Sequence, residues 1–195
     1  MNVLLINAHL NYPGWSEGTL NSTMTDIAKS FYADGGHTVT ETYIERGYDP
    51  EEEVQKHVDA DLVILQTPIN WFSAPWTYKK YVDEVFNSGL HSKTLLDNDG
   101  RTRSDPSRQY GTGGHMQGKK FMVAATWNAP KESFNNPSGV LFEGKGTDDL
   151  LLHITSNYKF TGFDILPNFG VYDIFKEDAD IADALDGYVD HLKNI

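Results

Sequence analysis

Small and hydroxyl-bearing residues gather in one short stretch that could hold a phosphate group. Ser16, Gly18, Thr19 and Asn21 stand at the expected start of a helix, and Glu17 is the only carboxylate among them. Free backbone N–H groups and the positive end of a helix dipole attract anions, with an effect of up to ~2 kcal/mol in a partly buried site. This stretch therefore predicts a pyrophosphate cradle, unless Ser16 or Thr19 simply caps the helix.

Large aromatic residues mark two further stretches, each expected to follow a strand. The residues are Ile69, Asn70, Trp71 and Phe72 in one stretch and Thr126, Trp127, Asn128 and Ala129 in the other. Aromatic rings give stacking area to a flat ligand, and amide groups can bind its polar edge. The pattern predicts a site for a planar aromatic ligand. The alternative is that Trp71 and Trp127 are core residues beneath long loops.

Two motifs resemble catalytic signatures but stand in the wrong context. Gly14–Gly18 fits the G-x-S-x-G nucleophile elbow of serine hydrolases, with His191 or Asp173 as later partners. An elbow places its serine directly after a strand, whereas Ser16 lies well beyond the expected strand end. Gly113–Lys119 fits the beginning of a P-loop, but the required Ser or Thr is missing and the segment precedes a strand. A serine hydrolase using Ser16 is kept as an alternative.

Composition excludes several classes of chemistry. The chain has no cysteine, and its 7 histidines show no metal-binding spacing, so we expect no disulfide, no thiolate chemistry and no metal site. A formal net charge of −12 argues against nucleic acid and acidic membranes as partners. No apolar run approaches the ~20 residues that cross a bilayer, so we expect a soluble, cytoplasmic protein without membrane insertion.

An alternation of strands and helices must position these stretches. Apolar and alternating runs predict strands at residues 3–8, 37–44, 61–67, 121–126 and 163–166. Helical spacing predicts helices that begin near residues 20, 50, 75, 149 and 181, the second of them capped by Asp49. The order predicts one α/β domain over residues 1–195, a doubly wound five-stranded parallel sheet of the flavodoxin-like kind with helices on both faces. Ligands of such sheets bind at the carboxyl ends of the strands, where the three stretches stand.

The connection between residues 89 and 118 is long and irregular, which is uncommon unless a loop binds a ligand or a partner. It carries the basic residues Arg101, Arg103 and Arg108. We interpret these as contacts to a nucleotide phosphate or to a partner subunit, with solvated loop charges as the alternative.

Several runs, taken in order, resemble one known family. They are Ser16–Asn21, Ala74–Thr77 with Lys79–Tyr81, Asp99–Arg103, Tyr110–Gly114, Gln117–Lys120 and Thr126–Pro130. Through them nearly the whole chain resembles the bacterial modulator of drug activity B family. The resemblance implies an NADPH:quinone reductase with a flavodoxin-like fold, bound FAD and a homodimeric assembly.

The resemblance also implies where FAD is contacted. The implied positions are Ser16, Gly18, Thr19, Leu20, Asn21, Thr23, Ile69, Asn70, Trp71, Phe72, Tyr110, Thr126, Trp127, Asn128 and Ala129. Related loops usually read Gly-Trp-Trp-Met where this chain has Ile69–Phe72, so acceptor preference is expected to differ. Distant mammalian-type quinone reductases place a Tyr and a His beside the flavin, but residues 131–143 contain neither, so no catalytic acid or base is assigned.

The expected reaction is a two-electron hydride transfer from NADPH to a quinone through FAD, with ping-pong kinetics because both substrates use one slot. FMN is the alternative flavin. Besides the serine hydrolase, the alternative function is that of a flavin-bearing regulatory or accessory subunit of a membrane transporter.

Overall fold

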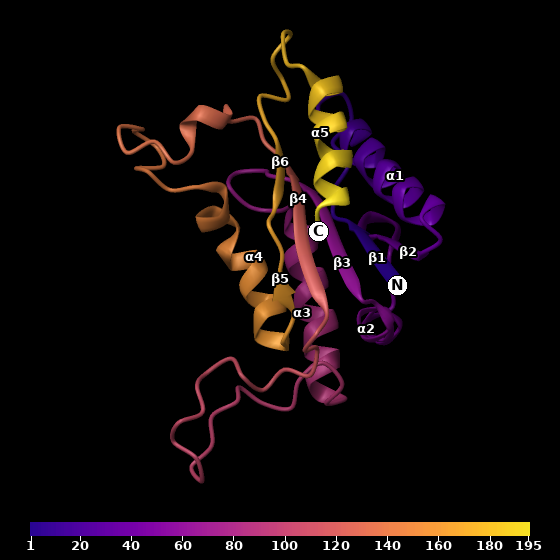
Figure 1. Cartoon of the computed structure of the whole chain (residues 1–195), viewed down its shortest axis with the longest axis vertical. Coiled ribbons are helices and arrows are strands. Elements are labelled where there is room, and N and C mark those ends of the chain that lie inside the picture. The colour runs from indigo at the N-terminus through magenta and orange to yellow at the C-terminus, as the bar shows by residue number, and fades with distance from the viewer.

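A computed structural model describes every residue from Met1 to Ile195. Its strands are β1 (Asn2–Asn7), β2 (Thr38–Tyr43), β3 (Leu62–Pro68), β4 (Lys120–Thr126), β5 (Asp164–Ile165) and β6 (Phe169–Val171). Its α-helices are α1 (Thr19–Asp34), α2 (Pro50–Asp59), α3 (Trp76–His91), α4 (Thr147–Thr161) and α5 (Ile181–Lys193). The strands pair in parallel in the order β2-β1-β3-β4-β5 (Figure 1). This is the flavodoxin-like order of a doubly wound sheet, as the sequence predicts.

Helices cover both faces of the sheet because its central strands are buried on both sides. Along β1, Val3 and Leu5 pack into one core with α1 and α5, whereas Leu4 and Ile6 pack into a larger core with α2, α3 and α4. Alternate residues of a strand point to opposite faces, so one apolar run supplies both cores. The expected single α/β arrangement is therefore confirmed.

The last strand is broken into two pieces, whereas the sequence predicts only the first. Pro167 follows β5 and has no N–H to donate to a ladder. The side chain of Asn168 bridges the gap, since its Oδ1 accepts a hydrogen bond of 2.9 Å from the backbone N–H of Val123 on β4. Pairing with β4 then resumes at β6, where Thr126 is aligned with Val171.

Two of the five α-helices begin with a carboxylate at the N-cap position that accepts hydrogen bonds from their free N–H groups. Asp49 accepts from the N–H groups of Glu51 and Glu52 at the start of α2, as predicted. Asp180 accepts from the N–H group of Asp183 at the start of α5. α1 and α3 have no side-chain cap and no acidic residue in their first turn. Both helices start at the carboxyl edge of the sheet, so this edge carries uncapped N–H groups.

The connection between α3 and β4 projects from the opposite, amino-terminal edge of the sheet (Figure 1). It contains no helix or strand over residues 92–119. Its base is fixed by the backbone N–H of Met116, which donates to Thr161 O at the end of α4 over 2.9 Å. None of the helices combines the length and apolar character that a membrane crossing requires.

Candidate functional site

A cavity of about 570 Å³ lies at the carboxyl edge of the sheet, within the size range typical of small-molecule sites. The register aligns Asn7 with Gln66 and Pro68 with Thr126, so β1, β3 and β4 end side by side there. The lining comes from the loops that follow these strands and from the loop that follows β6. It consists of Trp15 to Asn21, Pro68 to Phe72, Thr126 to Ala129, Leu141, Phe142, Ile174 and Phe175.

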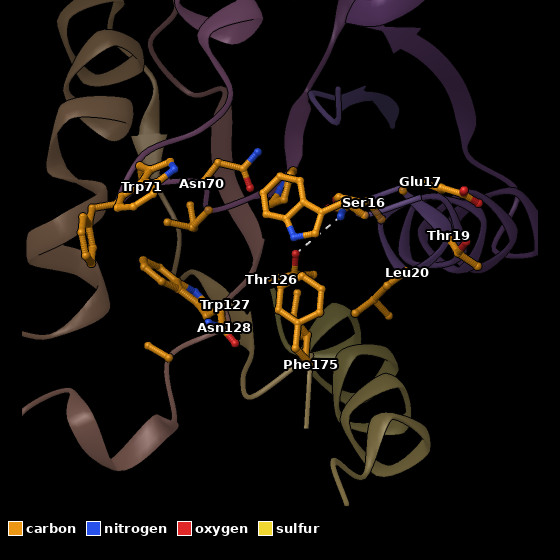
Figure 2. A pocket seen from close by; sticks show the side chains of 18 of the residues that line it. Ser16, Glu17, Thr19, Leu20, Asn70, Trp71, Thr126, Trp127, Asn128 and Phe175 are labelled. Atoms are coloured by element: carbon orange, nitrogen blue, oxygen red, sulfur yellow. Dashed lines mark hydrogen bonds between the residues drawn. The ribbon is translucent and has the colours of Figure 1, made fainter. Parts of the chain in front are cut away.

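One side of the cavity is the start of α1 (Figure 2). Gly18 occupies the N-cap position with a left-handed backbone, φ +81°, and no side chain accepts from the first turn. The alternative that Ser16 or Thr19 caps this helix is therefore wrong. The N–H groups of Thr19, Leu20 and Asn21, all cavity residues, are left for a ligand, and the helix dipole makes this end attractive to an anion.

Gly18 is required by space as well as by its backbone angle. A Cβ at this position would lie 2.5 Å from Nδ1 of His9. His9 is buried, its backbone N–H donates to Asn7 Oδ1 over 3.0 Å, and its Nε2 lies 3.4 Å from Ser16 Oγ. Burial lowers the pKa of His9, which keeps the ring neutral. The ring therefore acts as a packed support under the loop, a role the sequence did not reveal.

The single carboxylate of the loop is engaged by the loop itself. Glu17 Oε1 accepts a 3.2 Å hydrogen bond from the N–H of Gly14. Tyr12 and Ser16 exchange backbone hydrogen bonds of 2.8 Å each, which closes the turn that carries Trp15. The Trp15 side chain is 60% exposed and lines the cavity, so this turn presents an aromatic ring beside the uncapped helix start.

The loop after β3 is a tight two-residue turn made of aromatic residues. Asn70 N–H donates to Ser73 O over 2.8 Å and Ser73 N–H donates to Asn70 O over 3.2 Å. The two residues between them have positive φ, +49° at Trp71 and +69° at Phe72. Turns of this kind favour Asn and Gly, and bulky residues there are strained, which is a feature of functional sites. The turn places the Trp71 and Phe72 rings in the lining of the cavity.

The two tryptophans expected to flank a planar ligand differ in burial. Trp71 is 90% exposed and is no core residue, whereas Trp127 is 3% exposed and belongs to the larger core as well as to the cavity lining. The ring of Trp127 packs edge-on against Phe134, which stacks on Phe142 at 4.7 Å, and Phe142 meets Phe72 at 6.1 Å. Nε1 of Trp127 is buried and has no acceptor within the protein.

Polar side chains form the base of the cavity between α1 and the sheet. Asn21 Oδ1 accepts from Gln66 Nε2 over 2.9 Å, and Asn21 Nδ2 lies 3.5 Å from Thr126 Oγ1 (Figure 2). All three residues are buried. They fix the first turn of α1 to β3 and β4, which preorganises the uncapped N–H groups above them.

The structure brings the predicted contact positions together, with two exceptions. Thr23 lies one turn into α1, where its hydroxyl donates to Thr19 O over 2.9 Å, and it does not line the cavity. Tyr110 lies in the projecting connection with its ring 5.1 Å from that of Phe160, at the other edge of the sheet. Cavity residues that sequence reasoning missed are Trp15, Leu141, Phe142, Ile174 and Phe175. The apolar types of Phe142 and Phe175 in long loops were the available signal.

The basic residues of the connection are also remote from the cavity. Arg101 pairs with Asp99, and its guanidinium carbon lies 5.4 Å from the centre of the Tyr110 ring. Arg108 donates to Thr112 O over 3.4 Å within the same connection. A contact to a nucleotide phosphate in the cavity of the same chain is thus not supported for this cluster.

The hydrolase partners suggested by the motif are not assembled around Ser16. His191 lies on α5 with its Nε2 3.0 Å from Pro167 O, and Ser16 contacts His9 instead. Ser16 also sits in a loop nine residues after the end of β1, not on a tight turn after the strand. No group of three or more His, Cys, Asp or Glu side chains is placed to hold a metal ion.

Comparison with known proteins agrees with the fold described above. Residues 1–193 match the family model described as Flavodoxin-like fold. The NADPH:quinone oxidoreductase MdaB of Haemophilus influenzae is 43% identical over 195 residues, covering 100% of this chain and 99% of the relative. A solved NADPH-quinone reductase from P. pentosaceus shares 18% identity with a TM-score of 0.68, covering 100% and 99% of the two chains. General stress protein 14 from Treponema denticola, solved with FMN, shares 18% identity with a TM-score of 0.66, covering 98% and 95%.

Proposed function

This chain belongs to the flavodoxin-like fold family and to the family of the NADPH:quinone oxidoreductase MdaB, and from that premise we propose that it is an FAD-dependent NADPH:quinone oxidoreductase. The observation that carries the proposal is the cavity at the carboxyl edge, with uncapped helix N–H groups on one side and aromatic rings on the other. An anionic group and a flat ring system in one ligand match these two sides.

The residues present fit a flavin dinucleotide. The N–H groups of Thr19, Leu20 and Asn21 would hold the pyrophosphate, which the net charge of the protein would otherwise repel. Trp127 would face the ring system and offer its unpartnered Nε1 as a donor, and residues 69–72 would form the outer wall. A bound flavin would supply the redox chemistry, a two-electron transfer from NADPH to the quinone.

The protein's own contribution is placement and exclusion of water. Hydride transfer requires planar partners in contact, roughly 3–3.5 Å apart. The strained turn at Trp71 and Phe72 and the stack of Phe142 on Phe134 enclose the site with apolar surface. One slot of this shape admits the nicotinamide and the quinone in turn, so we propose ping-pong kinetics.

Additional aromatic surface in the cavity supports the proposal of FAD over FMN. Trp15 and Phe175 line the cavity near the uncapped start of α1, are 60% and 58% exposed, and contact no ring system of the sheet core. We assign them to the adenine that FAD has and FMN lacks. The same cavity in an accessory subunit would bind flavin without turnover, and no observation favours that alternative.

A homodimer is also part of the proposal. Tyr110 does not reach the cavity of its own chain, yet the family resemblance makes it a flavin contact. In the proposed dimer, the projecting connection of one subunit, with Tyr110 and Arg101, lies near the cavity of the other subunit. The protein is proposed to act in the cytoplasm on soluble quinones, without nucleic acid or membrane insertion.

The test is NADPH oxidation by the purified, FAD-loaded protein with menadione as acceptor. We expect acceptor-dependent NADPH consumption, parallel double-reciprocal lines when both substrates are varied, and a lower dissociation constant for FAD than for FMN. A protein that binds FAD but shows no acceptor-dependent turnover would instead fit the accessory role.

A further inference from the structure

Ser73 and His153 form a hydrogen-bonded pair beside the cavity that the proposed chemistry does not use. Ser73 Oγ lies 2.8 Å from His153 Nε2, and His153 Nδ1 lies 2.8 Å from Leu150 O. A carbonyl oxygen can only accept, so Nδ1 carries the proton of the neutral imidazole and Nε2 is an acceptor. The Ser73 hydroxyl therefore donates to Nε2. Both ring nitrogens are used, and the histidine is fixed by its own helix.

The pair connects two elements that are distant in the chain. Ser73 closes the strained turn after β3, and His153 lies 80 residues further along, in the second turn of α4. The backbone of the turn is closed by the two hydrogen bonds between Asn70 and Ser73, and the Phe72 ring packs against Phe142. Trp71 and Phe72 need a further restraint because positive φ is costly for bulky side chains. The hydrogen bond to His153 supplies this restraint from outside the turn.

Neither Ser73 nor His153 lines the cavity, whereas Asn70, Trp71 and Phe72 do. Any effect of the pair on a ligand must therefore pass through the turn. Trp71, at 90% exposure, stands at the rim, where an incoming planar molecule meets the wall first.

We propose that Ser73 and His153 are positioning residues, a latch that holds the Trp71–Phe72 turn against the cavity and so sets the affinity for the planar acceptor. This proposal rests on the quinone reductase function. The latch determines substrate recognition at the rim and takes no part in hydride transfer, so it acts on KM rather than on kcat.

The experiment compares Ser73→Ala, His153→Ala and the double variant in the FAD-loaded enzyme, with menadione as acceptor. Each single change is expected to raise the KM for menadione about three- to tenfold, the scale of one lost aromatic contact, with kcat within about twofold. The double variant should be no worse than either single variant, because both remove the same hydrogen bond. Ser73→Thr, which keeps the hydroxyl, should restore a KM near that of the wild type.

The control variant is His91→Ala, an exposed histidine at the end of α3, far from the turn. It should leave both constants unchanged. Unchanged KM values in Ser73→Ala and His153→Ala, or KM effects that add in the double variant, would overturn the latch.

A second readout does not depend on turnover. Imidazole ¹⁵N spectra of the FAD-loaded protein should show the neutral ring of His153 as the Nδ1–H tautomer, with its Nε2 resonance shifted by Ser73→Ala. An Nε2–H tautomer would contradict the latch. Wild-type protein without quinone turnover would refute the proposed function, and the spectrum alone would then decide whether the hydrogen bond exists.

Discussion

Replacing Trp71 by Asn should raise the free energy of unfolding and also raise the KM for menadione. A bulky residue with φ +49° costs about 1–3 kcal/mol, and Asn tolerates this conformation much better. The change loses little burial, because only about a tenth of the side chain is covered; at roughly 250 Å² for a whole Trp and 25 cal/mol per Å² this is ~0.6 kcal/mol. The net gain is therefore about 1 kcal/mol, or a rise in Tm of roughly 2–4 °C.

The same change removes one aromatic contact from the rim, so the KM for menadione should rise about two- to tenfold. Guanidinium denaturation and steady-state kinetics measure the two effects on one preparation. Trp76→Gln is the matched control: Trp76 is 65% exposed but lies outside the cavity, so neither the stability gain nor the KM change is expected. Destabilisation of Trp71→Asn by more than about 1 kcal/mol would refute the strain argument.

Three further predictions concern the loop under the phosphate, the adenine side and the buried histidine. Gly18→Ala should weaken FAD binding more than tenfold, measured by fluorescence quenching, because the added Cβ meets His9. The control is Gly36→Ala, which has a similar positive φ but open space around it and should leave FAD affinity unchanged. An equal loss of FAD affinity in both variants would refute the clash with His9. Trp15→Ala should reduce the preference for FAD over FMN with little effect on FMN, and an unchanged preference would contradict the adenine assignment. Burial lowers the pKa of His57, so folded His57 stays neutral while the unfolded chain takes up a proton below pH ~6.5. Stability should then fall from pH 7 to 5 by up to ~1.4 kcal/mol per pH unit in denaturation curves, less steeply in His57→Gln; an equal slope would contradict this.

The sequence predicts the frame of the site because that frame follows from local patterns. Apolar runs at strand spacing and helix end signals place β1, β3 and β4, and the chemistry-bearing loops come directly after them. Parallel strands bring such loops to one edge whatever the details of packing. For this reason most of the expected contact positions line one cavity.

What the sequence misses depends on contacts between distant residues. The packing of His9 under Gly18 and the hydrogen bond from Ser73 to His153 need the fold before they can be seen. The placement of Phe142 depends on the path of a loop with no periodic pattern. The resumption of pairing after Pro167 was missed because β6 has only three residues, and Asn168 replaces the lost ladder bond.

Tyr110 shows the limit of transferring positions from a family one by one. The family resemblance implies that Tyr110 contacts the flavin, but its own chain holds it at the opposite edge of the sheet, against Phe160. Sedimentation of the FAD-loaded protein, with FAD affinity measured for Tyr110→Ala, separates a contact across a dimer from a purely structural residue.

The most direct measurement is a crystal structure of the protein grown with FAD. The pyrophosphate should accept hydrogen bonds from the N–H groups of Thr19, Leu20 and Asn21, and the tricyclic ring should lie against Trp127 with space for the acceptor between the ring and the Trp71–Phe72 turn. A flavin bound elsewhere, or a cavity closed by those aromatic side chains when FAD is in excess, would contradict the account.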